Sequence, residues 1–269
     1  MRNTNPAAVP AALRLKWHRD WKALCDNIPS IIFEYRFYTD MYCDLGHMQV
    51  SRETYRDMKS LENVSFQGCM SDQTHRMYMP TSLPLIMMGE TLFDHSIDYD
   101  QFTDDYFLGA FGAGGTKCRA YLEELSGLLS PSNYRVGGKN GVEEQGIGKI
   151  YVQKKSWINN PEVAERAKRI PALIAEFLPV INCGITECES NAQRLSWFYL
   201  KHHSEICLRF AEILLAGAEN DMPRAREKYE VLAEYVAEHE LEFHNAFDLF
   251  LFLRAVRMKI GMSNFNYYD

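Results

Sequence analysis

Acidic side chains stand at the end of a short apolar run near the start of the chain and in the residues after it. Two of them together could cleave a glycosidic bond. The run covers residues 30–35 and reads Ser-Ile-Ile-Phe-Glu-Tyr. Glycoside cleavage commonly uses two carboxyl groups about 5 to 10 Å apart, so Glu34 with Asp40 or Asp44 is a candidate catalytic pair. The alternative is that Glu34 forms a salt bridge with a basic residue and the aspartates cap turns.

Three tyrosines stand among these carboxylates, at Tyr35, Tyr38 and Tyr42. A tyrosine ring stacks on the apolar face of a pyranose while its hydroxyl makes a hydrogen bond, so all three are candidate substrate-binding residues. The alternative is that these tyrosines lie at the rims of large, well-packed helices, which would equally account for their presence.

A second apolar run, residues 64–70 (Val-Ser-Phe-Gln-Gly-Cys-Met), is also followed by polar side chains. Gln73, His75 and Arg76 supply the planar donors and acceptors that sugar hydroxyls need, and Arg76 would suit an acidic sugar. We therefore predict that they bind substrate, and the alternative is that His75 and Arg76 are a rim salt-bridge pair.

Helices are expected on either side of these runs. Leu13, Trp17, Trp21 and Leu24 recur at helical spacing and predict a helix over residues 7–27, and a second helix is expected over 52–62. Helix, strand, helix and strand with short connections indicate a (β/α) barrel or another parallel α/β sheet. In a parallel barrel the active site lies at the carboxyl ends of the strands, where the polar residues above stand.

From Leu83 onward only helices are expected. They cover residues 84–93, 100–111, 117–129, 161–182, 187–216, 224–239 and 243–260, and a polar, glycine-rich loop covers about 130–153. The predicted fold class is α/β followed by all-α and mostly α overall. Residues 1–97 form the C-terminal part of a (β/α) barrel, and residues 98–269 form a helical domain.

Cysteines and histidines near the middle of the chain raise the question of a metal site. Cys183 and Cys188 have a plausible ligand spacing, but His202 and His203 are adjacent instead of being separated by three to five residues. His239 and His244 lack a second pair of ligands in the sequence. We therefore expect no metal ion. We also expect no nucleotide cofactor, because the glycines at 112, 114 and 115 follow no strand and indicate a turn.

Composition narrows the possible partners. The formal net charge of −7 disfavours a protein that binds nucleic acid through its phosphates. No run approaches the roughly 18 apolar residues of a membrane span. Seven scattered cysteines do not resemble a disulfide framework, so a reduced, cytoplasmic location is expected.

Several short segments resemble, in order, a bacterial family of glycoside-hydrolase-like proteins whose domain has no assigned function and whose architecture is related to α-glucuronidases and hexosaminidases. They are residues 68–76 (GCMSDQTHR), 79–84 (MPTSLP), 99–107 (YDQFTDDYF), 110–112 (AFG) and 121–122 (YL). The resemblance implies a barrel followed by a helical extension. Because family members carry most of the barrel before the position of Met1, it also implies that this chain corresponds to their C-terminal part and lacks a complete active site.

Three functions remain open from the sequence. The first is part of a glycoside hydrolase-like enzyme that acts on an oligosaccharide or polysaccharide. The second is a carbohydrate-binding or scaffold module without catalysis, and the third is a helical interaction protein. The cost of exposed strand edges favours a partner chain or self-association that covers the open barrel.

Overall fold

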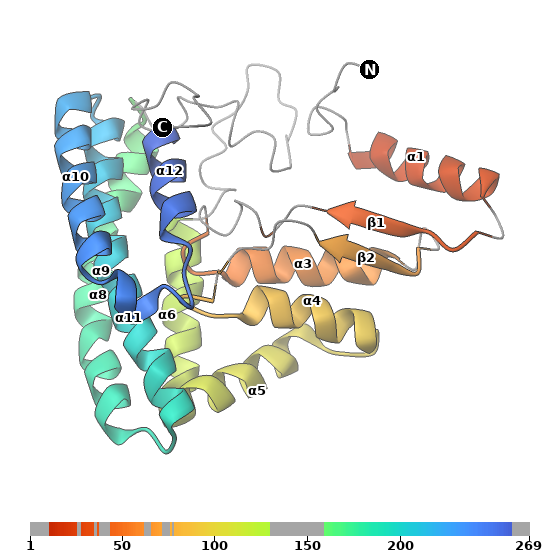
Figure 1. The fold of residues 1–269 in the computed structure, drawn as a ribbon, viewed down its shortest axis with the longest axis horizontal. Coiled ribbons are helices and arrows are strands. Elements are labelled where there is room, and N and C mark those ends of the chain that lie inside the picture. The colour runs from red at the N-terminus through yellow and green to blue at the C-terminus, as the bar shows by residue number, and fades with distance from the viewer. Residues whose placement is uncertain are drawn as a thin grey trace.

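The structure, a computed structural model, describes residues 11–25, 28–34, 37, 44–61, 66–71, 76, 78–129 and 159–259. It is mostly helical, which confirms the expectation of a mostly-α protein (Figure 1). The predicted loop at about 130–153 lies outside the described residues.

Two short strands form at the two apolar runs: β1 (Ile31–Glu34) lies within the first, and β2 (Gly68–Ser71) covers the end of the second and extends one residue beyond it. They pair in parallel, with Ile31 opposite Gly68 and Glu34 opposite Ser71. Helix α1 (Ala11–Leu24) precedes β1, and α3 (Met48–Ser60) lies between the strands in the chain. The described residues therefore contain one parallel β–α–β crossover, and the barrel itself stays a prediction.

The two faces of the strand pair differ in environment. Ile32 and Cys69 are partly buried against the core, and the sulfur of Cys69 lies 3.8 Å from that of Met58 in α3. Ile31, Phe33 and Met70 are each more than half exposed. Figure 1 shows the strand pair and α1 at one edge of the molecule, away from the long helices.

The helices after β2 form the body of the molecule. They are α4 (Leu83–Phe93), α5 (Tyr99–Phe111), α6 (Gly115–Leu129), α8 (Pro161–Glu187), α9 (Asn191–Ala218), α10 (Met222–Glu238), α11 (Glu240–Phe243) and α12 (Leu249–Lys259). Helix α9 packs against α5, α8 and α10. Side-chain caps start α9 and α10: Ser190 accepts from Gln193 N before α9, and Asp221 accepts from Arg224 N before α10.

Helix α8 is longer than the helix predicted for residues 161–182 and continues through both Pro171 and Pro179 to Glu187. Its apolar stripe, which includes Ile170, Ile174 and Ile181, is buried. By length and composition α8 is the one described helix that is apolar enough to cross a membrane, which the sequence prediction did not anticipate. This is weak evidence for a span, because buried core helices of soluble proteins meet the same criterion.

The glycine turn between α5 and α6 has a packing role. Gly112 has φ 59°, and residues 112–114 form one 3₁₀ turn, η4. A Cβ on Gly114 would lie 2.6 Å from the ring of Trp197, whose indole nitrogen donates to the Phe111 carbonyl. The turn thus admits a buried tryptophan from α9.

One hydrophobic core extends from α3 to α12. It includes Met48 and Met87 on one side of the expected boundary at residue 97, and Phe107 and Leu214 on the other. Helices α3, α4, α5 and α6 therefore share buried side chains with the long helices.

Candidate functional site

The predicted sugar site begins where the two strands end. Because β1 and β2 are parallel and in register, Glu34 and Ser71 lie side by side at the same edge. The chain continues from that edge into residues that the structure does not describe: Tyr35, Tyr38, Asp40, Tyr42, Gln73 and His75. The side chain of Glu34 also lies outside the described part.

Asp44 is placed in the interior, with no exposed surface. One carboxylate oxygen accepts from the backbone N–H of Val50 at 2.8 Å, and the other accepts from the Ser126 hydroxyl at 2.5 Å. Asp44 therefore caps the first turn of α3 and ties it to α6, which corresponds to the capping alternative for the aspartates. Burial raises the pKa of Asp44 to about 6, although the bonds from Ser126 and Val50 oppose this shift.

The short segment from Asp44 to His47 is held on several sides. His47, at φ 61°, has its ring Nδ1 2.8 Å from the Thr81 carbonyl, and the buried His203 ring bonds to the Leu45 backbone. A Cβ on Gly46 would lie 2.2 Å from the Leu122 carbonyl in α6, so only glycine fits there. Burial lowers the pKa of His47 to about 4. This segment is therefore fixed against α6, α9 and the residues that precede α4.

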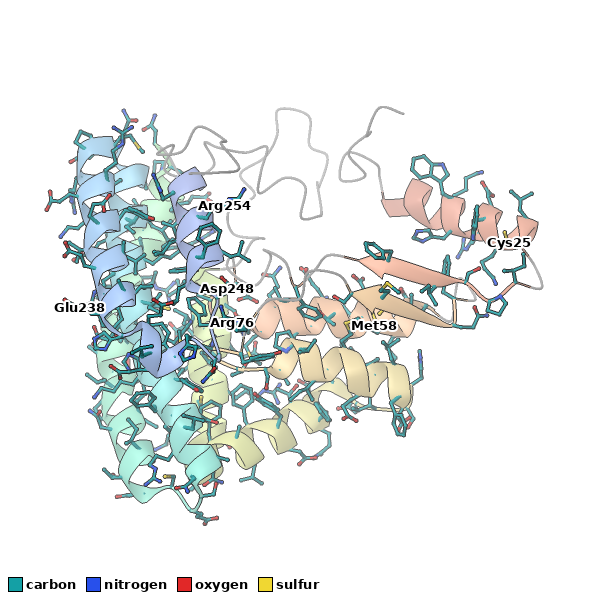
Figure 2. All side chains as sticks on the ribbon, viewed as in Figure 1. Cys25, Met58, Arg76, Glu238, Asp248 and Arg254 are labelled. Carbon is teal, nitrogen blue, oxygen red and sulfur yellow. The ribbon has the colours of Figure 1, made fainter. Side chains whose placement is uncertain are left out.

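Arg76 joins the chain after β2 to the region between α11 and α12. Its guanidinium donates to the His244 carbonyl at 2.7 Å and lies 3.7 Å from a carboxylate oxygen of Asp248 (Figure 2). The backbone N–H of Asp248 donates in return to the Arg76 carbonyl, and Tyr78 N donates to the Ala246 carbonyl. Arg76 is thus paired with Asp248, while half of its side chain stays exposed; the alternative that pairs it with His75 involves a residue outside the described part.

The residues that the sequence offered as zinc ligands lie in different surroundings; they are Cys183, Cys188, His202 and His203. The thiol of Cys183 is exposed and donates to Glu187, and Cys188 bonds to the Ile185 carbonyl. His203 faces inward and lies 3.5 Å from the sulfur of Cys207. Its neighbour His202 points toward α10 instead.

His202 belongs to a second polar cluster, which the sequence prediction missed. Its Nε2 lies 3.1 Å from one carboxylate oxygen of Glu242, and the other oxygen lies 2.7 Å from Nδ1 of His239. The Nδ1 of His202 lies 2.8 Å from the hydroxyl of Tyr235. We call His202, His239 and Glu242 the imidazole–carboxylate cluster. Within the described ranges it is the group of His, Cys, Asp and Glu side chains that is close enough to hold a metal ion.

Three elements build this cluster. Helix α9 contributes His202, which is buried, while His239 stands at the junction of α10 and α11 and Glu242 follows on α11. His239 and Glu242 are partly exposed, so one side of the cluster opens to solvent. Burial lowers the pKa of His202, and the bond from the His239 ring lowers the pKa of Glu242.

Charged groups also lie near the cluster, among them Lys201, whose positive charge contributes to lowering the pKa of His202. The Arg209 guanidinium stacks on the Tyr235 ring at 4.0 Å from its centroid and makes an ion pair with Glu205 at 2.7 Å. The three-residue spacing from His239 to Glu242 was the available local signal, but His202 comes from another helix and no spacing rule connects it to them.

Comparison of the chain with protein-family models, with curated proteins and with solved structures finds no match.

Proposed function

We propose that this chain is part of a carbohydrate-active, glycoside hydrolase-like protein that binds an oligosaccharide or polysaccharide where β1 and β2 end. The observation that carries the proposal is the parallel register, with Glu34 beside Ser71. Two segments therefore begin at one common edge, and they hold Tyr35, Tyr38, Asp40, Gln73 and His75. Parallel α/β proteins bind their ligands at this edge.

The exposed face of the strand pair supports a larger sheet. Parallel sheets are normally covered on both faces, and on one face of β1 and β2 the side chains of Ile31 and Met70 are more than half exposed. We propose that further strands and helices, from a partner chain or a second copy, cover this face. The same elements would extend the sugar site.

The positions of Asp44 and Arg76 narrow the proposed roles. Asp44 is buried and stabilises the first turn of α3, so we no longer propose it as a catalytic residue. Glu34 and Asp40 remain as the proposed catalytic carboxylates. Arg76 keeps an exposed side while Asp248 and the His244 carbonyl hold its guanidinium in place. In this proposal Arg76 is a fixed positive charge near the sugar, suited to a uronic acid.

The test is saccharide binding by titration calorimetry, with neutral oligosaccharides and uronic-acid oligosaccharides as separate ligands. We expect Glu34→Gln to weaken binding at least tenfold, and Arg76→Ala to weaken the acidic ligands more than the neutral ones. Arg76→Ala should lower the free energy of unfolding by about 1 kcal/mol or less, because exposed ion pairs contribute little.

The matched control is Glu53→Gln, since Glu53 is an exposed glutamate on the adjacent α3. It should bind every saccharide as the unmodified chain does. If no saccharide binds, or if Glu34→Gln and Glu53→Gln behave alike, the proposed sugar site is wrong.

A further inference from the structure

We propose that the imidazole–carboxylate cluster of His202, His239 and Glu242 is a binding site for a divalent transition-metal ion of the zinc class. The site goes beyond the proposed sugar function and lies between α9 and the α10–α11 junction. It uses residues that no function described above requires.

The ligand atoms already have the spacing of a coordination shell. All three lie within 4.8 Å of one another, and both Glu242 oxygens face an imidazole nitrogen, at 2.7 Å and 3.1 Å. Zinc–nitrogen and zinc–oxygen bonds of about 2.0–2.2 Å in a tetrahedron separate neighbouring ligand atoms by about 3.4 Å. Small side-chain rotations would therefore bring His202 Nε2, His239 Nδ1 and one Glu242 oxygen to bonding distance.

The donor set selects the type of metal. Two imidazole nitrogens and one carboxylate oxygen suit zinc and other first-row transition ions, whereas magnesium and calcium prefer oxygen ligands alone. Three protein ligands leave a fourth position for water, and the exposed sides of His239 and Glu242 place that position toward solvent.

The surroundings support the same assignment. With a metal on Nε2, the His202 ring carries its proton on Nδ1 and donates it to the Tyr235 hydroxyl, 2.8 Å away. Such an outer partner fixes the orientation of a metal-binding histidine. Glu238 and Glu240 flank His239 in the chain, and Figure 2 shows Glu238 on the outer side of α10. The positive charge of Arg209 is compensated by Glu205.

The experiment is calorimetric titration of the full chain with Zn²⁺ after EDTA treatment and dialysis, together with thermal unfolding with and without the ion. We expect one Zn²⁺ per chain, a rise of several degrees in Tm, and no response to Mg²⁺. His239→Ala and Glu242→Gln change partly exposed side chains and should fold, as circular dichroism would verify. Each should weaken Zn²⁺ binding at least tenfold.

Two further variants separate the cluster from other zinc-binding groups. His244→Ala removes a neighbouring histidine outside the cluster, and Cys183→Ser removes an exposed thiol. Both should bind Zn²⁺ normally, whereas Tyr235→Phe, which removes only the outer hydroxyl, should weaken binding about 10–100-fold.

Three results would overturn the metal site. They are no Zn²⁺ binding by the unmodified chain, equal loss in His244→Ala and His239→Ala, or loss in Cys183→Ser. The last result would assign the ion to the thiol at the end of α8.

Discussion

Two buried ionisable side chains, Asp44 and His47, change the stability of the fold in opposite directions as the pH falls. Burial raises the pKa of Asp44 to about 6 and lowers that of His47 to about 4. For Asp44 the folded pKa exceeds its unfolded value of 3.8, so its contribution is present at low pH and is lost as pH rises toward 6. For His47 the folded pKa lies below 6.5, so stability is lost as pH falls from 6.5 toward 4.

The effects of Asp44 and His47 oppose each other between pH 4 and 6, while His203, whose pKa burial lowers to about 3, adds to the loss of stability on acidification. Single substitutions should separate the contributions of Asp44 and His47. Asp44→Asn removes the carboxyl that gains a proton on folding, so acidification in this window should cost about 1 kcal/mol more per pH unit than in the unmodified chain. His47→Asn removes the imidazole and should lower the free-energy cost of acidification by a similar amount per pH unit. Asparagine is chosen because it tolerates the left-handed conformation of this position. Urea unfolding at pH 4, 5, 6 and 7 measures both slopes.

Two other ionisable groups face this segment, Glu53 from α3 and His203 from α9. The charge of His47 also lowers the pKa of His203, so His47→Asn also reports the coupling between these two histidines, whereas Asp44→Asn leaves that pair in place. Parallel stability curves for the two variants would contradict the assigned directions.

At the scale of elements, close approach between helices depends on glycine. Gly184 in α8 faces the buried Trp197 of α9, and a Cβ there would lie 2.3 Å from the indole ring. Trp197 also packs edge-on against Phe111, at 4.9 Å between ring centroids, and its other side meets Gly114. The junction of α5, α8 and α9 is therefore built around one tryptophan and two glycines.

Gly184→Ala should lower the free energy of unfolding by about 1–3 kcal/mol, because the ring or the helix must shift to admit the methyl group. Gly89→Ala on α4 is the matched control, since nothing lies within 4 Å of its Cβ position. It should raise stability by up to about 1 kcal/mol, because alanine favours the helix. Chemical unfolding of both variants measures the contrast, and equal effects would contradict the packing at Trp197.

Over the whole molecule, stability is concentrated in the long helices. Half of α9, including Trp197, Leu200, Ile206, Phe210 and Leu214, is buried, and α5, α8 and α10 surround it. The strand pair lies at the edge with half-exposed apolar side chains. A two-stranded sheet is marginal in water without packing on its faces.

Native-state hydrogen exchange should show this difference. The amides of α9 should exchange slowest, near the rate set by global unfolding, because they open only when the core does. The amides of β1 and β2 should exchange faster by a factor of 100 or more, because their opening free energy should be lower than that of α9 by about 3 kcal/mol or more. Equal protection of the strands and α9 would indicate that the strand pair is part of the cooperative core.

The sequence alone determined the order of helices and the two strands, because helical periodicity, prolines and caps are local signals. The spacing of Leu13, Trp17 and Trp21 predicts α1, and the two apolar runs predict β1 and β2. The predicted helix ends were less accurate, since α8 gains enough from its contacts with α9 to continue past Pro179.

Only the tertiary structure decided which polar side chains meet. It buries Asp44 against Ser126, joins Arg76 to Asp248, and brings His202 beside His239 and Glu242. Each of these contacts connects elements far apart in the chain, and packing of the helices determines the distance between them. Periodicity reports which face of a helix is buried, but it carries no information about the residue that packs opposite that face.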